Sequence, residues 1–290
     1  MVFGIVALVG CSTALTSGNG SDVAMVGATA TPTTTIAPAT TVAPSSTTVV
    51  PTTTVAPSTT EATTTTLAAN IVEVPALDPP IPALGTSHGA ETVRLQARLN
   101  ELGFWVQSED GDYGLTTRQA VMAFEKYMGF DNPDGRLDEQ AATAISNMDL
   151  RPMARANSGT LVEIDKAKQL LFFVIDGRTE YILNASTGNG EAYEEPDQNT
   201  PGEFQRGIAL TPSGLHDVNR ERPEGWWAGD LGEIYRPKYF VGGVAVHGSN
   251  SIPNYPASHG CVRVSVPAMD WIWEAGIMPL NSPVWVHDGA

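Results

Sequence analysis

The chain has 290 residues, of which 32 are acidic and 16 basic, and its formal net charge at pH 7 is −16. Binding to nucleic acid requires clusters of Lys and Arg, which this sequence lacks, so we expect no nucleic-acid partner. The acidic balance is equally a poor fit to peripheral binding on an anionic membrane surface. The length allows two domains of ordinary size.

An apolar segment opens the chain at 1–11 and ends in the tetrad Leu-Val-Gly-Cys11. The segment is too short to span a bilayer, which takes ~20 residues, and is typical of the end of a secretory signal. The tetrad resembles the lipobox of bacterial lipoproteins, and this resemblance implies a lipid anchor on Cys11. No Lys or Arg precedes the apolar run, so we expect the natural start to lie upstream of Met1. The alternative is a truncated ordinary signal with a chance cysteine.

Residues 12–84 are dominated by Thr, Pro, Ala and Ser and have almost no charge and no apolar periodicity. Such a segment cannot bury enough apolar surface to offset the entropy of ordering it, so we predict a disordered linker. Pro-rich chains favour the extended polyproline II conformation, which suits a stalk that holds a folded domain away from a membrane. A spacer without a positional role is the alternative.

Residues 85–148 show the pattern of three short helices joined by turns. Leu95, Leu99 and Leu102 recur at helical spacing on one face, and Gly103 is placed to end the first helix. The hydroxyl groups of Thr116 and Thr117 are candidate caps for the second helix, and the carboxylate of Asp138 is a candidate cap for the third. The residues expected to point from the second helix into the core are Ala120, Val121, Phe124 and Met128.

The helical region also resembles the small peptidoglycan-binding domain that accompanies many cell-wall enzymes. The matching residues run through the whole region and are Leu95-Gln96, Leu99, Leu102-Gly103-Phe104, Asp110-Gly111-Asp112-Tyr113-Gly114, Thr117, Ala120-Val121, Phe124 and Asp134-Gly135. The resemblance implies a three-helix fold with peptidoglycan as its partner. Gln96 is expected to be solvated or to make a local hydrogen bond. The Asp-rich turn is not expected to bind calcium, because Leu115 stands where an EF-hand loop starting at Asp110 needs Gly.

Beyond residue 159 the sequence changes to short β-rich runs, which predict a mostly-β domain, a sandwich or small barrel, over 159–290. We expect strands at 160–164, 169–175, 179–183, 205–210, 241–247 and 283–287, and one helix at 267–275. The Asp176-Gly177 dipeptide predicts a two-residue hairpin turn. The acidic run 194–197 is predicted to be a solvated loop, or alternatively a lid that faces an amine.

Two motifs hold the residues with chemical potential, His247-Gly248 and Ser258-His259-Gly260-Cys261-Val262-Arg263. Imidazole can take the proton of a thiol, and small residues around Cys261 let a substrate carbonyl approach backbone N–H groups. We expect no disulfide with Cys11, because it would close a loop of roughly 250 residues, much of it linker. The residues alone leave three interpretations open: a cysteine nucleophile, a structural Cys and His, and a zinc site of His247, His259, Cys261 and water.

Together the two motifs are similar to the signature of the L,D-transpeptidase catalytic domain, and the similarity extends over 159–290. It includes a Thr-Pro-Gly-Glu-Phe turn at 200–204, one residue shorter than the family's Thr-Pro-x-Gly-x-Phe. The resemblance implies that Cys261 is the nucleophile and His247 its proton acceptor. It also implies that backbone amides near Gly260 and Cys261 stabilise an oxyanion, and that the carbonyl of Gly248 orients the imidazole. It implies no metal and no organic cofactor.

Other residues near the motifs are candidate substrate contacts, namely Ser258, His259, Arg263, Tyr239 and Tyr255. His259 is two residues from Cys261, so in an extended segment both side chains share one face and His259 is a rival base. The family motif favours His247, and His259 is expected to shape the loop. Arg263 either binds a substrate carboxylate or pairs with an acidic neighbour. The two tyrosines, with Trp226 and Trp227, either line a cleft or belong to the core.

By this resemblance the donor is a tetrapeptide stem of peptidoglycan. Cys261 attacks the carbonyl of the third residue, D-alanine leaves, and the amine of a neighbouring stem resolves the thioester into a cross-link between third residues. Two alternatives remain, resolution by water, which makes an L,D-carboxypeptidase, and a non-catalytic cell-wall-binding scaffold. We expect an exported protein whose partners are stem peptides and glycan, and which reaches the membrane only through its lipid anchor.

Overall fold

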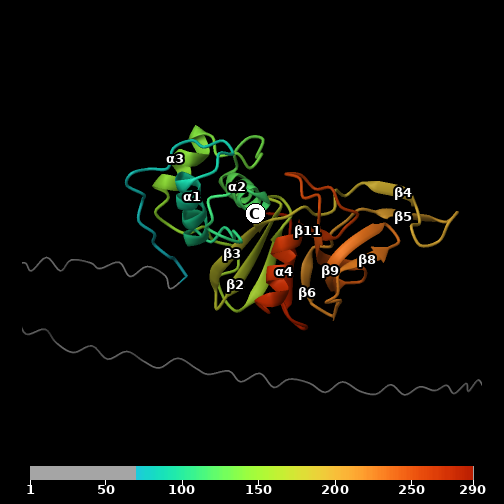
Figure 1. Cartoon of the computed structure of the whole chain (residues 1–290). Coiled ribbons are helices and arrows are strands. Elements are labelled where there is room, and N and C mark those ends of the chain that lie inside the picture. The colour runs from blue at the N-terminus through green and yellow to red at the C-terminus, as the bar shows by residue number, and fades with distance from the viewer. Residues whose placement is uncertain (1–69, 290) are drawn as a thin grey trace, which may run out of the picture. The chain divides into compact units, whose positions relative to one another are not determined.

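The computed structural model describes residues 70–289. The leader, Cys11 and most of the Thr- and Pro-rich segment therefore lie outside the described residues. The described part has three helices followed by a mostly-β region with one further helix (Figure 1), which is the architecture that the sequence predicts.

The end of the predicted linker is ordered, which corrects its boundary at residue 84. Val74 and Ile81 are buried in a cluster with residues of the helices. The backbone N–H of Val74 donates to the carbonyl of Asp149 at 2.8 Å, and that of Ile81 donates to Oγ of Ser146 at 2.9 Å. Val74 and Ile81 anchor this stretch to the helices. The prediction missed them because it rested on the average composition of residues 12–84, which is polar.

The three helices of the first region are α1 (Ala90–Glu101), α2 (Leu115–Met128) and α3 (Glu139–Asn147). The leucine stripe of α1 is fully buried, as predicted. Gly103, with a φ of 92°, follows the end of α1 in a backbone conformation that side chains disfavour. The predicted cap of α3 is present, because the carboxylate of Asp138 accepts the N–H of Ala141 at 2.8 Å.

Two predicted details of α2 are wrong. The residue at its N-cap is Gly114 and no side chain caps it, because the hydroxyl oxygen of Thr117 instead accepts a hydrogen bond from Nε2 of Gln96 at 3.0 Å. Met128 is 39% exposed in the last turn of α2 and does not reach the core.

Gln96 holds the Asp-rich turn between α1 and α2 and is only 1% exposed. Its Nε2 donates to Oδ1 of Asp110 at 3.1 Å and to the carbonyl of Asp112 at 2.9 Å. Its Oε1 accepts the backbone N–H of Gly111 at 2.8 Å. Of the two expectations for this residue, the local hydrogen-bonding one is therefore observed.

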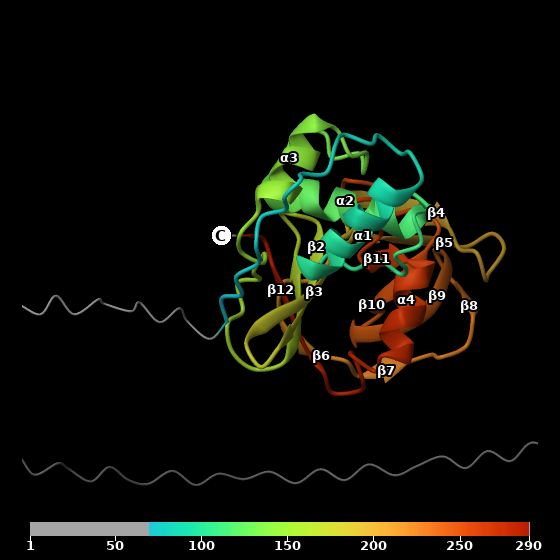
Figure 2. The ribbon, with the colours of Figure 1, turned by 60° about the vertical axis from the view of Figure 1, so that its left-hand side comes forward.

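The mostly-β region contains strands β1 (Leu161–Asp165), β2 (Leu170–Ile175), β3 (Arg178–Asn184), β4 (Ala192–Pro196), β5 (Phe204–Ile208), β6 (Gly214–Asp217), β7 (Arg220–Glu221), β8 (Trp226–Gly229), β9 (Gly232–Val241), β10 (Val244–Ser249), β11 (Val262–Ser265) and β12 (Pro283–His287). One sheet has the order β3-β2-β1-β12-β6 and a second has the order β11-β10-β9-β7, with β8 also paired to β9. Helix α4 (Val266–Glu274) lies along the second sheet beside β9 and β10 (Figure 2).

Strands β4 and β5 pair with each other as a separate hairpin that projects from the body of the molecule (Figure 1). The prediction of a loop at 194–197 is therefore wrong for its first three residues, which belong to β4. This strand is acidic and has no buried residue, so apolar alternation gives no signal there. The predicted turn at Asp176-Gly177 is present between β2 and β3, with φ values of 50° and 79°.

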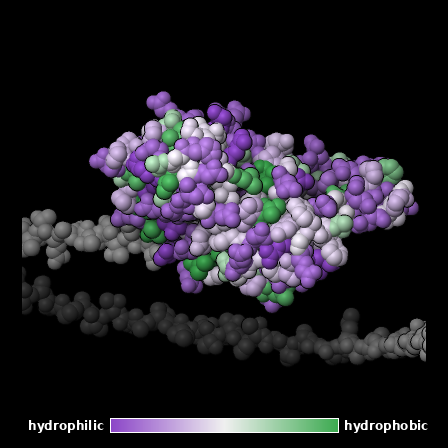
Figure 3. Space-filling model, in the orientation of Figure 1, coloured by the Kyte–Doolittle hydropathy of each residue, from purple (hydrophilic) through white to green (hydrophobic). Residues whose placement is uncertain are grey.

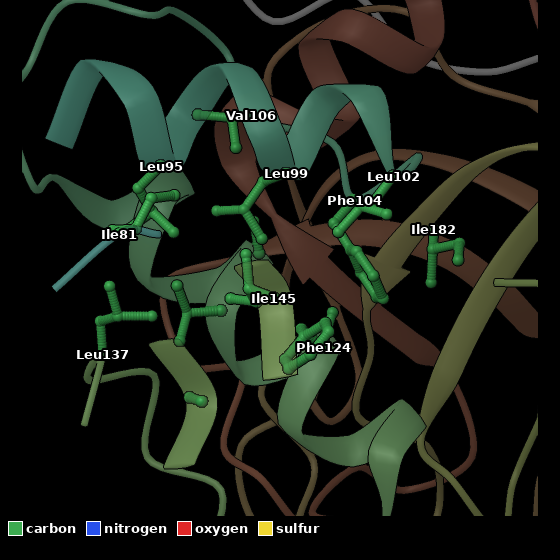
Figure 4. Packing of buried hydrophobic residues seen from close by; sticks show 14 of the residues in the cluster. Ile81, Leu95, Leu99, Leu102, Phe104, Val106, Phe124, Leu137, Ile145 and Ile182 are labelled. Carbon is green, nitrogen blue, oxygen red and sulfur yellow. The ribbon is translucent and has the colours of Figure 1, made fainter. Parts of the chain in front are cut away.

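Strand β2 lies between two hydrophobic cores. Leu170, Phe172 and Val174 belong to a cluster with the helices, whereas Leu171 and Phe173 belong to a second cluster with α4 and strands of both sheets. Because side chains alternate along a strand, burial on both faces gives a continuous apolar run. Figure 4 shows the first cluster, in which residues from the helices approach Ile182 of β3.

Polar contacts join the helical region to the second region as well. The ammonium group of Lys126 on α2 donates to the carbonyls of Ala185 at 3.1 Å and Gln169 at 3.3 Å, and burial lowers the pKa of Lys126 to about 7. Nδ2 of Asn184 donates to Oε1 of Gln119 at 2.6 Å. Nδ2 of Asn254 donates to the carbonyl of Pro133 at 2.8 Å. The two regions thus share a hydrophobic core and are also joined by hydrogen bonds around it.

The face seen in Figure 3 is mostly hydrophilic, with apolar residues in small scattered groups. Within residues 70–289, no helix combines the length and the apolar character that crossing a membrane requires.

Replacement of Phe104 by Ala tests the shared core. Phe104 is fully buried, its ring packs edge-on against Phe124 at a centroid distance of 5.5 Å, and its backbone pairs with Ile182 of β3. We expect the free energy of unfolding to fall by about 3–5 kcal/mol in urea denaturation. Because the cluster spans both regions, tryptophan fluorescence of the β region and helical circular dichroism should shift together. Two separate transitions, with only the helical one moved, would contradict a shared core.

Candidate active site

The second sheet has two different faces. Val246, Val262 and Val264 lie fully buried in the cluster that includes α4. The alternation of side chains puts His247 and its register partner Arg263 on the opposite face. Cys261 immediately precedes β11 and belongs to the same alternating set as Arg263. One face of the sheet is thus apolar and packed, and the other presents the chemically active groups.

His247 and Cys261 line the same cavity, whose volume is about 720 Å³. His247 is only 3% exposed, and its Nδ1 lies 2.8 Å from the carbonyl oxygen of Gly248. A carbonyl oxygen only accepts hydrogen bonds, so Nδ1 carries the proton and Nε2 of the neutral ring keeps a free lone pair. The hydrogen bond therefore fixes both the orientation and the tautomer of the imidazole.

Only glycine fits at position 248, because neighbouring side chains leave no space for a Cβ atom. A Cβ atom at this position would stand 2.9 Å from Cδ1 of Tyr235 and 3.2 Å from Cβ of Met269. Any larger residue would push β10 away from β9 and α4, and the carbonyl that orients His247 would move with it.

The surroundings of both Cys261 and His247 favour the uncharged form of the side chain. Burial lowers the pKa of His247 to about 4, although the hydrogen bond to Gly248 acts in the opposite direction. Burial also raises the pKa of the Cys261 thiol above its usual range, with the backbone of Ala245 and the charge of Arg263 opposing it. Both shifts disfavour a thiolate–imidazolium pair before a substrate arrives.

Ser258 fixes the loop that holds Cys261. Its Oγ accepts the backbone N–H of Gly260 at 3.1 Å and donates to the carbonyl oxygen of Cys261. The side chain is 3% exposed and also borders the cavity. Its hydroxyl is therefore occupied within the loop.

Gly260 lies in a conformation and a space that exclude a side chain. Its φ is +136°, and a Cβ atom would stand 2.8 Å from the carbonyl oxygen of Leu210. Its carbonyl accepts the hydroxyl of Thr211 at 2.7 Å, which in turn accepts the N–H of Gly188 at 2.9 Å. The loop before Cys261 is thus held from several sides.

His259 points to the β4–β5 hairpin. Its Nε2 lies 3.0 Å from Oε1 of Glu195, and its ring packs against Tyr193 at a centroid distance of 4.9 Å. The partner of His259 is therefore a carboxylate of the acidic run 194–197, and the contact ties the hairpin to the loop of Cys261.

The β4–β5 hairpin also meets the turn between β8 and β9. Nδ2 of Asn199 donates to Oδ1 of Asp230 at 2.8 Å, and the backbone N–H of Gln198 donates to the carbonyl of Asp230 at 2.8 Å. Residues of both hairpins border the cavity. The two hairpins thus form connected walls around the space next to Cys261.

Most of the predicted site residues come together in this cavity. Its lining includes Cys261, His247, Ser258, His259, Arg263 and Tyr239. Gly248 and Gly260 adjoin it through the contacts described above. Tyr255 is 60% exposed and is not part of the lining. Of the two tryptophans, Trp227 lines the cavity and Trp226 packs on Tyr235.

Several residues that line the cavity belong to no sequence motif and were not predicted as part of the site. They come from short or exposed strands and turns, and include Tyr193, Asn199, Arg220, Arg222 and Asp230. Only their pairing in three dimensions brings them to the cavity. Among residues 70–289, no group of three or more His, Cys, Asp or Glu side chains is placed to hold a metal ion together.

Two family models match the described part of the chain. The family model of the L,D-transpeptidase catalytic domain matches residues 159–286, and the model of a putative peptidoglycan-binding domain matches residues 88–145. Among curated proteins none matches the chain.

Solved structures include similar proteins. The L,D-transpeptidase from Xylanimonas cellulosilytica DSM 15894 is 47% identical, with 74% of this chain and 100% of that chain covered and a TM-score of 0.62. An L,D-transpeptidase from Stackebrandtia nassauensis is 19% identical, with 72% and 97% covered and a TM-score of 0.38. One from Mycobacterium tuberculosis H37Rv is 16% identical, with 44% and 57% covered and a TM-score of 0.34.

The shifted pKa values predict how Cys261 reacts with a neutral alkylating reagent. The thiolate is the reactive form, burial raises the pKa of the thiol, and His247 is uncharged above pH about 4. The alkylation rate should therefore rise steadily from pH 6 to pH 8.5, without a plateau below the usual thiol pKa of ~8.5. Peptide mass spectrometry of the Cys261 peptide gives the rate, with Cys261→Ala as the blank. Equal rates at pH 6 and pH 8 would instead indicate a resting ion pair.

Proposed function

This chain belongs to the L,D-transpeptidase family, and we propose that it cross-links peptidoglycan stem peptides through a thioester on Cys261. The observation that carries the proposal is the joint position of Cys261 and His247 in one cavity, with the imidazole oriented by the carbonyl of Gly248. A nucleophile, a base and a group that orients the base are the elements of covalent acyl transfer.

In the first half of the reaction, Sγ of Cys261 attacks the carbonyl of the third residue of a tetrapeptide stem. The thiol proton passes to Nε2 of His247, whose lone pair is free because Nδ1 donates to Gly248. The S–C bond forms, the C–N bond breaks, and the imidazolium returns the proton to the amine of departing D-alanine. Proton transfer during attack suits a pair that rests uncharged.

The developing oxyanion needs N–H donors that are free of other partners. The N–H of Gly260 already donates to Oγ of Ser258 at 3.1 Å. We therefore assign the stabilising role to the N–H of Cys261, and to Gly260 the role of allowing the carbonyl to approach. Ser258 then acts by holding the loop and not by binding substrate.

In the second half, the amine of a neighbouring stem attacks the thioester. His247 takes its proton, the new C–N bond forms, the C–S bond breaks, and Cys261 recovers its proton. The two hairpins form walls of the cavity in which this step takes place. The helical region, which matches a peptidoglycan-binding model over residues 88–145, holds the enzyme on its substrate.

Variants of the pair test the chemistry. Cys261→Ala should abolish release of D-alanine from a tetrapeptide stem, and His247→Ala should reduce it by about 10²–10⁴-fold because general-base assistance is lost. His259→Ala should cost less than His247→Ala, since His259 contacts the hairpin. A chelator should leave the activity unchanged. Loss of activity with the chelator, together with survival after alkylation of Cys261, would contradict the mechanism.

Product analysis separates transpeptidase from carboxypeptidase activity. With a donor stem and an acceptor stem present, mass spectrometry should find the cross-linked dimer, with free tripeptide as the minor product. Tripeptide alone would assign the chain to hydrolysis. Neither product, with Cys261 intact, would indicate a wall-binding scaffold.

We further propose that Cys11 is lipidated and that the linker carries the enzyme from the membrane into the wall. The Leu-Val-Gly-Cys11 tetrad supports this proposal. Mass spectrometry of the N-terminus of the native protein should find a diacylated cysteine as the first residue. An unmodified Cys11 within a longer mature chain would contradict it.

A further inference from the structure

The cavity next to Cys261 contains positive charge that no carboxylate neutralises. Six arginines form ion pairs with carboxylates elsewhere, and these are Arg94, Arg98, Arg151, Arg178, Arg206 and Arg236. Within residues 70–289, three of the arginines that have no carboxylate partner line the cavity together, namely Arg220, Arg222 and Arg263. In a chain with 32 acidic residues, three unpaired guanidinium groups around one cavity indicate a site for an anion.

Arg220 and Arg222 are held by aromatic rings. The guanidinium of Arg220 lies 3.9 Å from the ring centre of Tyr239, and that of Arg222 lies 3.5 Å from the ring centre of Trp227. Nε of Arg222 is buried and has no hydrogen-bond partner among the described residues. Stacking orients a guanidinium while it leaves the planar N–H groups free for a carboxylate.

The acidic residues of the cavity do not neutralise these groups. Asp230 and Glu233 are both part of the lining. Asp230 accepts a hydrogen bond from Asn199 at 2.8 Å, and neither residue forms an ion pair within the described chain. The arginines of β7 and the loop after it are therefore available to a ligand.

The register of the second sheet gives the backbone separation between Arg220 and Cys261. Arg220 is paired with Tyr239, and Tyr239 with Ala245. The pairing of Val246 with Val262 places Cys261 next to Ala245 in the same row. Strands are ~4.8 Å apart, so the Cα atoms of Arg220 and Cys261 are separated by about 14 Å.

This separation distinguishes two anion sites. Arg263 is two residues from Cys261 on the same face, so it faces groups next to the bond that breaks. Arg220 and Arg222 lie further from Cys261, three strand spacings across the same sheet. The carbonyl attacked by Cys261 belongs to the third residue of the stem, and the side chain of that residue starts at the adjacent carbon.

We propose that Arg220 and Arg222 form a carboxylate subsite that selects stems whose third residue carries a free carboxylate at the end of its side chain. The proposal rests on the proposed function for the identity of the peptide. The two guanidinium groups bind the carboxylate by charge-assisted hydrogen bonds. The uncharged amide of the same side chain offers one acceptor oxygen and no negative charge, so it binds the two guanidinium groups more weakly and leaves their charge unneutralised.

Three donor stems test the subsite: one with free carboxylates, one with an amide at the side-chain tip, and one with an amide at the C-terminus. The protein should prefer the first over the second by at least about tenfold in kcat/KM, the usual effect of a hydrogen bond to a charged group. Arg220→Gln with Arg222→Gln should remove this preference and leave the ratio of kcat/KM between the first and the third stem unchanged. Arg178→Gln removes one positive charge outside the cavity, so it controls for a general loss of charge and matches the single variant Arg220→Gln.

A measurement independent of turnover accompanies these assays. Cys261 is labelled with maleimidohexanoate and with its uncharged amide, and the ratio of the two rates is followed on the Cys261 peptide. The ratio cancels changes in thiol reactivity, and it should fall roughly threefold or more in the double variant but not in Arg178→Gln. If no stem is turned over, this ratio still tests the anion site, and the failure then concerns the proposed function.

An unchanged stem preference or an unchanged labelling ratio in the double variant would overturn the subsite. A change in the kcat/KM ratio between the first and the third stem alone would overturn the assignment of the carboxylate. If the double variant does not fold, the single variant Arg220→Gln is the test, because Arg220 is exposed. It should show at least half of the loss in stem preference and in labelling ratio that is expected of the double variant.

Discussion

The hydrogen bond between Nδ1 of His247 and the carbonyl oxygen of Gly248 is the contact on which the site depends. It is made within one strand, so it needs no flexible partner and no second charge. It selects the tautomer that leaves Nε2 free, and it holds a ring that burial keeps neutral. Gly248 permits this geometry because Tyr235 and Met269 fill the space that a side chain would need. The packing of β10 against β9 and α4 therefore determines the orientation of the His247 ring.

The shared core has a consequence for the way the wall is engaged. Side chains of β2 alternate between a cluster with the helices and a cluster under the active-site sheet. The loop that precedes Cys261 is also bonded to the helical region, through Asn254 and the carbonyl of Pro133. A helical domain connected in this way does not move as an independent module on a tether. Binding of glycan by the helices would therefore place the cavity at a defined position on the polymer.

The sequence predicts the parts of this structure that local physics controls. The leucine stripe of α1, the Asp138 cap and the Asp176-Gly177 turn depend on neighbours in the chain, and each is present. Strands β4, β7 and β8 are short or exposed, and nothing in their composition distinguishes them from loops. Cys261 and His247 belong to sequence motifs and could be predicted. Arg220 and Arg222 belong to none, and they reach the cavity only because β7 pairs with β9. Long-range pairing of that kind leaves no local pattern, so this half of the site could not be predicted.

In the proposed mechanism, uncharged Cys261 and His247 require that attack on the carbonyl and transfer of the thiol proton be coupled. A thiol whose pKa is raised exposes little thiolate, which is the form that oxidants attack. The proposed substrate supplies the electrophile at which both steps occur. The most direct measurement is the intact mass of the protein after brief incubation with a tetrapeptide stem, followed by mapping of the adduct. We predict a mass increase equal to the stem less D-alanine, located on the Cys261 peptide and removed by hydroxylamine, as a thioester is. Product formation by Cys261→Ala, or turnover without any adduct on Cys261 in a rapidly quenched reaction, would contradict it.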